Sequence, residues 1–151
     1  TDVQQLINEN HLRWDSLGEF LAISVALENI GKTNVKSKIL SKCLSKAIEK
    51  LLIKEKSPSR KVGEIDNRGS HFYLALYWAE HLSKQNENID LKDEFEMVYN
   101  LLSKNENQII KEIDSTQGCN IDLGGYYNTN DEITKKVMRP SKLFNEIIYN
   151  L

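Results

Sequence analysis

The sequence predicts a mainly α fold, a compact multi-helix domain around one buried central helix. Apolar residues recur at three- and four-residue spacing along most of the chain, which is the period of an α-helix. The 151 residues include only seven glycines and two prolines, too few for the turns of an all-β protein. No region alternates strand-like and helix-like patterns. Residues 1–151 are expected to form a single domain, because a chain of this length supports one hydrophobic core.

The first predicted helices follow from end signals and from one regular apolar stripe. Asp15 or Ser16 caps a helix that runs to about Ile30, with Glu19 in the capping-box position, and Gly31 ends it. The next helix has a stripe of apolar residues at helical spacing: Val35, Ile39, Leu40, Cys43, Leu44, Ala47, Ile48, Leu51 and Leu52. Since Pro58 cannot continue a helix, a loop is expected over residues 56–69.

The helix after this loop is predicted to lie at the centre of the fold. It should extend over about residues 70–85, and every residue from 72 to 79 is apolar or aromatic. A helix that is apolar on all sides lies inside a protein. Tyr77 and Trp78 should therefore be mostly buried. Gly69 is expected to permit a close backbone approach. The residues expected to cap and anchor this helix are Asp66, Asn67, Arg68 and Ser70.

Further helices are predicted over the last third of the chain. One covers residues 91–103, and its inward residues are Phe95, Val98, Leu101 and Leu102. Another carries Ile109, Ile110 and Ile113 and stops before Gly118. Residues 121–127 should be irregular because they contain two consecutive glycines, and Tyr126 and Tyr127 are interpreted as packing aromatics. Residues 131–137 and 141–150 complete the predicted set of helices.

Positive charge is concentrated in one part of the chain. Residues 32–61 hold ten of the twenty Lys and Arg residues but only two acidic residues. Five lysines at four-residue intervals, which we call the lysine ridge, are Lys38, Lys42, Lys46, Lys50 and Lys54. Such a ridge is either a solvated helix face or the binding face of a free-standing helical module for an acidic partner. Nucleic-acid binding is not predicted, because no aromatic residues interleave with the lysines.

The cysteines and histidines do not have metal-ligand or disulfide spacing. Cys43 and Cys119 are expected to be reduced thiols in or near the core. The chain also has no apolar run of membrane-spanning length and no signal-like start, so a cytoplasmic protein without membrane partners is expected. An internal fragment would have lost such a signal. The loop at residues 56–69, rich in Arg, Lys and Ser, suits an anion site on a rigid helical support.

Four strings give the chain a family resemblance. They are HLRWDSLGEFLAIS (residues 11–24), KSPSRKVGEIDNRGSHFYLALYWAEHL (residues 56–82), IDLGGYY (residues 121–127) and MRPS (residues 138–141). In this order and nearly this spacing, they resemble the C-terminal part of the monomeric, NADP-dependent isocitrate dehydrogenases. Those enzymes are several times longer, so the resemblance implies that the chain is a C-terminal fragment.

The resemblance implies specific cofactor-binding residues. Arg13 and Arg60 correspond to the two arginines that grip the 2′-phosphate of NADP, and Trp14 and Asp15 line the same pocket. Guanidinium groups suit this task because they are permanently charged and donate several hydrogen bonds. Asp2 stands where the family has a phosphate-binding His. Since a carboxylate would rather accept from a ribose hydroxyl, NAD is the alternative cofactor to NADP.

The resemblance also implies the reaction of the parent enzyme. Isocitrate would be oxidised by hydride transfer to NADP and would lose CO2 to give 2-oxoglutarate, with Mg²⁺ or Mn²⁺ polarising the carbonyl. The catalytic, metal-binding and substrate-binding residues are expected upstream, so the fragment alone should be inactive. The parent should be monomeric. An excised piece should expose an apolar patch that drives self-association.

Overall fold

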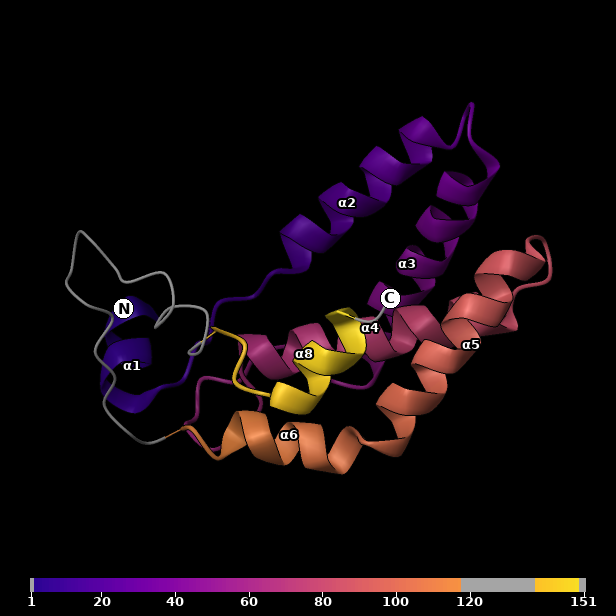
Figure 1. Cartoon of the computed structure of the whole chain (residues 1–151). Helices are drawn as coiled ribbons and strands as arrows, with labels where there is room; N and C mark the ends of the chain where they lie inside the picture. Colours follow the sequence, from indigo (N-terminus) through magenta and orange to yellow (C-terminus); the bar gives the residue numbers. More distant parts are fainter. Residues whose placement is uncertain (1, 118–137, 150–151) are drawn as a thin grey trace.

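The computed structural model describes residues 2–117 and 138–149, and all their regular structure is helical, as predicted. The helices are α1 (Asp2–Glu9), α2 (Leu17–Ile30), α3 (Val35–Ile53), α4 (Asn67–Lys84), α5 (Ile89–Lys104), α6 (Glu106–Asp114) and α8 (Lys142–Tyr149). In Figure 1 the α2–α3 hairpin extends away from the bundle, and α1 lies at the opposite end. None of the described helices combines the length and the apolar character needed to cross a membrane.

Helix α4 forms the core, as its uninterrupted apolar run predicts. It packs against α3 and α5, while α6 and α8 cover its remaining side. Phe72 is fully buried and meets Phe144 of α8 edge to face, with ring centroids 5.2 Å apart. Tyr77 is buried, and Trp78 is partly exposed, with its indole Nε1 donating to the carbonyl oxygen of Leu40. The predicted burial of this helix is therefore confirmed.

The start of α4 differs from the prediction by three residues. The helix begins at Asn67 because the Asp66 side chain accepts hydrogen bonds from the backbone N–H groups of Arg68 and Gly69. Gly69 permits a close approach to its backbone, as expected, and the approaching group is the side chain of Ile65. A Cβ atom at position 69 would lie 2.9 Å from a side-chain carbon of Ile65. The helix ends at Lys84, before the extended residue Gln85.

The capping box predicted for α2 was also wrong. The helix spans Leu17–Ile30 as expected, but the Ser16 side chain makes no capping hydrogen bond. Its hydroxyl accepts from the Asn67 amide instead, at 2.8 Å. Asp15 replaces it locally, because its Oδ1 accepts from the backbone N–H of Leu17 at 3.0 Å. The Ser16 hydroxyl therefore binds a residue distant in the sequence instead of a backbone N–H group in the first turn of its own helix.

Three residues predicted to face inward are exposed. Val35 lies at the tip of the α2–α3 hairpin with 68% of its surface exposed, and Leu52 lies near the end of α3. On α5, Leu102 faces the core and turns its neighbour Leu101 outward. The remaining members of both stripes are buried or partly buried. Cys43 is a free, buried thiol, as expected, and burial raises its pKa.

Some of the predictions fall outside the described residues, and one described helix was not predicted. The segments 121–127 and 131–137, with Cys119, Tyr126 and Tyr127, lie outside the described residues. The helix with Ile109 and Ile113 ends at Asp114, and the last helix spans Lys142–Tyr149, both close to prediction. Helix α1 was missed. Its eight residues are too few to give a decisive helical pattern.

Helix α2 leaves much of its apolar surface uncovered. Only Phe20 and Ser24 of its residues are buried. It packs closely on α3 through serines, with the hydroxyl of Ser24 lying 2.7 Å from that of Ser45. The large apolar side chains that it exposes are Leu21, Ile23, Val25 and Ile30. Such a surface is expected of a piece excised from a larger protein.

The acid stability of the fold should depend on Glu80. Burial raises the pKa of this carboxyl group. Lys50 and Tyr99, which donate hydrogen bonds to it, and the nearby charge of Lys84 lower the pKa by more, so the net pKa lies below its ordinary value. Because the folded pKa lies below the unfolded pKa, ionised Glu80 stabilises the fold at neutral pH. This contribution disappears as the pH falls from the ordinary carboxyl range, about 4.3, through the folded pKa.

We therefore expect Glu80→Gln to reduce the difference in unfolding free energy between pH 7 and pH 3, measured by urea denaturation. Glu94→Gln, an exposed position on α5, is the matched control and should leave this difference unchanged. An identical pH dependence in Glu80→Gln and the unaltered protein would contradict the assignment.

Candidate cofactor-phosphate site

The segment that carries Arg13 is held by the first turn of α4. The backbone N–H of Asn67 donates to the carbonyl oxygen of Leu12 at 2.6 Å. The Asn67 side-chain amide donates to the carbonyl oxygen of Trp14 at 2.9 Å. The backbone N–H of Leu12 donates to Asp66 Oδ2 at 3.1 Å. Because residues 10–16 are not helical, α4 supplies the hydrogen bonds that their backbone requires.

A buried ion pair fixes the beginning of the same segment. Arg68 Nη2 and Nε both donate to Asp66 Oδ2, at 2.6 and 2.9 Å. Arg68 also donates to the side chain and the carbonyl oxygen of Asn10. Both charged side chains are almost fully buried, so these hydrogen bonds are needed to offset their desolvation. Asn10 adopts a left-handed conformation, φ 48°, which turns the chain out of α1.

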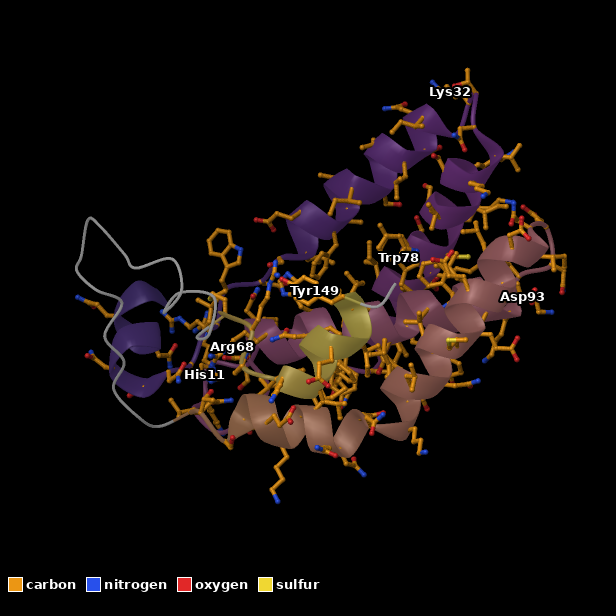
Figure 2. All side chains as sticks on the ribbon, viewed as in Figure 1. His11, Lys32, Arg68, Trp78, Asp93 and Tyr149 are labelled. Carbon is orange, nitrogen blue, oxygen red and sulfur yellow. The ribbon has the colours of Figure 1, made fainter. Side chains whose placement is uncertain are left out.

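The loop that carries Arg60 is attached to the Arg13 segment through His11. The ring nitrogens of His11 lie 2.6 Å from the carbonyl oxygen of Ser59 and 2.6 Å from Oε1 of Gln117. Gln117 also binds the loop, since its Oε1 accepts from the N–H of Gly63 and its Nε2 donates to the carbonyl oxygen of Glu64. Figure 2 shows His11 and Arg68 between α1 and the start of α4.

The structure places the two predicted arginines on segments that both meet Gln5 of α1. Arg13 lines a shallow hollow of about 240 Å³ with Gln4, Gln5, Asn8 and Glu9. The Gln5 side chain donates to the carbonyl oxygen of Arg60 at 3.0 Å. Arg13 and Arg60 both have exposed side chains. That both guanidinium groups bind one phosphate stays a prediction.

The other predicted site residues have different surroundings. Trp14 is 52% exposed, a large fraction for an indole, so it offers an apolar surface beside Arg13. Asp15 is exposed and holds the first turn of α2 through its hydrogen bond to Leu17. Asp2 is the first residue of α1, and its side chain is outside the described part of the structure. Their roles in cofactor binding stay predictions.

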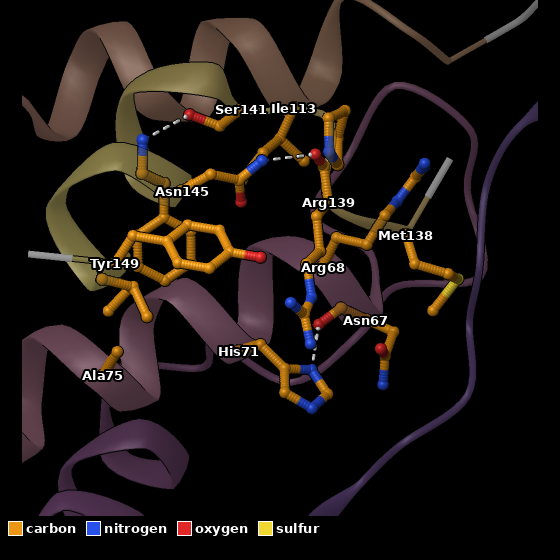
Figure 3. Close-up of a pocket in the computed structure, with 13 residues that line it drawn as sticks. Asn67, Arg68, His71, Ala75, Ile113, Met138, Arg139, Ser141, Asn145 and Tyr149 are labelled. Atoms are coloured by element: carbon orange, nitrogen blue, oxygen red, sulfur yellow. Dashed lines mark hydrogen bonds between the residues drawn. The ribbon is translucent and has the colours of Figure 1, made fainter. Parts of the chain in front are cut away.

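A larger cavity lies between α4 and α8, and the predicted cofactor-binding residues do not line it. It has a volume of about 550 Å³ and is lined by His71, Arg139, Asn145 and Tyr149 among others (Figure 3). Its wall is stabilised locally, since the Asn145 amide donates to the carbonyl oxygen of Arg139 at 2.9 Å. Size alone does not make it the cofactor site, because neither Arg13 nor Arg60 lines it.

The helical fold and the two anchored arginine segments form a candidate site for an anionic ligand. The family of the chain follows from its sequence. The sequence model of the family described as "Monomeric isocitrate dehydrogenase" matches residues 1–149, and the chain belongs to that family. The family resemblance read from the four sequence strings is thereby confirmed.

Three relatives show the extent of the similarity. "Isocitrate dehydrogenase [NADP] 2" of Psychrobacter sp. (strain 13A) is 54% identical over 99% of this chain and 20% of its own length. The protein of the same description from Mycobacterium tuberculosis is 54% identical over 95% of this chain and 20% of its own. "Isocitrate dehydrogenase [NADP]" of Azotobacter vinelandii is 50% identical over 95% of this chain and 20% of its own length. The chain spans about one fifth of the length of these relatives.

Sequence reasoning did not find the residues that support the site. Gln5, His11 and Gln117 make contacts across 48 to 106 positions of the chain. His11 stands inside the string HLRWDS, but a single histidine there gives no indication of its partners. The anchoring role predicted for Asp66, Asn67 and Arg68 is confirmed, and it extends to the Arg13 segment.

Asn67→Ala should destabilise the fold by about 1–3 kcal/mol, because it leaves the carbonyl oxygen of Trp14 and the buried hydroxyl of Ser16 without their donor. Urea denaturation followed by tryptophan fluorescence measures this change. Asn100→Ala, an exposed position on α5, is the control and should change the unfolding free energy by less than about 0.5 kcal/mol. Equal effects of the two substitutions would show that Asn67 does not hold the segment.

Proposed function

We propose that the chain is the C-terminal part of an NADP-dependent isocitrate dehydrogenase and that it binds the adenosine 2′-phosphate of NADP. The observation that carries this proposal is the shared attachment of the Arg13 and Arg60 segments, which His11 and Gln5 hold at one end of the molecule. Two guanidinium groups on a rigid support suit a phosphomonoester dianion. The family match and the names of the relatives support the same cofactor.

The complete enzyme would convert isocitrate to 2-oxoglutarate with reduction of NADP and release of CO2. Bound Mg²⁺ or Mn²⁺ would supply charge stabilisation for the decarboxylation. Among residues 2–117 and 138–149, no three His, Cys, Asp or Glu side chains gather as metal ligands would. As the family resemblance implies, the metal and isocitrate would be bound mainly by the rest of the enzyme. The isolated chain is expected to be inactive.

Two alternatives to this proposal are NAD as the cofactor and a free-standing helical module for an acidic partner. A carboxylate at Asp2 favours NAD over NADP, if its side chain reaches the adenosine ribose. The lysine ridge would suit a free-standing module for an acidic partner. Parts of the ridge, however, are neutralised within the fold, since Lys50 pairs with Glu80 and Lys42 with Glu87. The family match over almost the whole chain favours the dehydrogenase.

The location and assembly of the enzyme belong to the same proposal. The free thiol of Cys43 fits a reducing compartment such as the cytoplasm. Neither nucleic acid nor a membrane is proposed as a partner. The family description, monomeric isocitrate dehydrogenase, supports a monomeric parent enzyme. The apolar surface of α2 would then be covered in the parent and exposed in the isolated chain.

Arg13→Ala and Arg60→Ala in the full-length enzyme should each raise the KM for NADP about ten- to a hundredfold, as expected for loss of a charge-assisted hydrogen bond. The kinetics with NAD should change little, because NAD has no 2′-phosphate. The double variant should lose most of the preference for NADP. Steady-state kinetics with both cofactors measures these effects.

Arg139→Ala is the matched control, because it removes an exposed arginine that lines the other cavity. It should leave the KM for NADP unchanged. Equal losses with NADP and NAD in the Arg13 and Arg60 variants would assign both arginines to structure and would remove the basis of the proposed site.

The isolated chain should self-associate at high concentration through α2. The double substitution Leu21→Ser and Val25→Ser should shift it toward monomer, because it removes apolar area from the exposed surface of this helix. Sedimentation velocity over a concentration series measures the shift. Met97→Ser, an exposed apolar position on α5, serves as control. Strictly monomeric behaviour of the unaltered chain would contradict this prediction.

A further inference from the structure

We propose that Gln5 of α1 is a positioning residue that fixes Arg60 relative to Arg13 and so contributes to the selection of NADP over NAD. The proposal rests on the proposed function, since it assumes that both arginines bind the 2′-phosphate. Gln5 binds the backbone of Arg60 and lines the hollow of Arg13. It acts through Arg60 and is not itself assigned a contact with the phosphate.

The first observation is how Arg60 is attached to the rest of the molecule. Nε2 of Gln5 donates to the carbonyl oxygen of Arg60 at 3.0 Å, across 55 positions of the chain. Within the described part of the chain, no other hydrogen bond or ion pair reaches Arg60. The preceding residue, Ser59, is held by His11. Gln5 therefore adds a second point of attachment, at Arg60 itself, and leaves the guanidinium group available for a ligand.

The second observation is that the orientation of the Gln5 amide is determined by its neighbours. Its Nε2 also lies 3.3 Å from Oε2 of Glu9, one helical turn further along α1. A backbone carbonyl and a carboxylate both accept hydrogen bonds, so the group that faces them must be the donor. Exchanging the amide oxygen and nitrogen would place oxygen against oxygen at both contacts. The network therefore assigns Nε2 to the side of Arg60.

The third observation concerns the other end of the same amide. Oε1 of Gln5 is buried, and no described residue donates a hydrogen bond to it. A buried acceptor without a donor costs free energy, whereas an apolar side chain of similar length has no such cost. Arg60 is exposed, so water can replace the donor that its carbonyl oxygen would lose. Fold stability therefore does not account for an amide at Gln5. Residues that conflict with stability in this way are expected at functional sites.

These observations make α1 the common support of the two arginine segments. Arg13 and Gln5 line one hollow of about 240 Å³, and the Gln5 amide extends from it to Arg60. Two guanidinium groups bind one phosphate well only when their spacing is held fixed. Without the amide, the Arg60 backbone can shift relative to Arg13, and cofactors that carry the 2′-phosphate bind more weakly. NAD lacks this phosphate and is affected little.

Gln5→Met in the full-length enzyme tests this role, because methionine keeps the length and helix preference of glutamine but has no N–H donor. The KM for NADP should rise roughly two- to tenfold, the effect of losing one neutral hydrogen bond, with little change in kcat or in the KM for NAD. The urea midpoint of unfolding, followed by tryptophan fluorescence, should not fall. Gln108→Met, at an exposed position on α6, is the matched control and should change none of these properties. A lowered urea midpoint, failure to fold, or equal rises in KM for both cofactors would assign Gln5 to structure and overturn the proposal.

Double variants separate this proposal from the proposed function. If Gln5 acts through Arg60, Gln5→Met should have no further effect on the KM for NADP in an Arg60→Ala enzyme. It should keep its effect in an Arg13→Ala enzyme, where Arg60 still requires its position. A full additional rise in the Arg60→Ala background would overturn the positioning role. If Arg60→Ala raises the KM for NADP but Gln5→Met does not, the inference fails and the proposed function stands. If Arg60→Ala itself has no effect on this KM, both fail.

Discussion

The buried pair between Asp66 and Arg68 is the interaction on which the rest of the structure depends. Asp66 caps α4, binds the Arg68 guanidinium and accepts the backbone N–H of Leu12. Arg68 in turn binds both the side chain and the backbone of Asn10. Two desolvated charges persist only when their hydrogen bonds are complete. The pair therefore fixes together the start of α4, the end of α1 and the path of the segment between α1 and α2.

The sequence predicted those parts of the fold that depend on local pattern. The eight-residue apolar run located α4, and the spacing of Ile39, Leu44 and Leu51 located the buried face of α3. Errors occurred where a distant partner replaced a local one. Ser16 resembles the start of a capping box, yet its hydroxyl binds Asn67, 51 residues away. Periodicity contains no information about such a partner, and so helix ends were predicted less well than helix interiors.

The candidate site shows the same contrast between features that local sequence pattern predicts and features that depend on distant residues. Arg13, Trp14, Asp15 and Arg60 came from the family resemblance, because a single exposed arginine gives no physical indication of its ligand. The contacts of His11 with Ser59 and Gln117 could not be predicted, since they join three separate parts of the chain. A buried histidine with two acceptors is recognised only once the fold has placed it.

This arrangement separates the groups that would bind the phosphate from the groups that hold them. The arginines are exposed, where their guanidinium groups can meet a ligand. Their backbones are fixed by buried side chains, chiefly Asn67, Arg68 and His11. An exposed side chain can change with little effect on stability, whereas a buried anchor cannot. If Arg13 and Arg60 bind the cofactor as proposed, substitutions there should alter cofactor preference while the fold persists, whereas an altered anchor should change stability and cofactor affinity together.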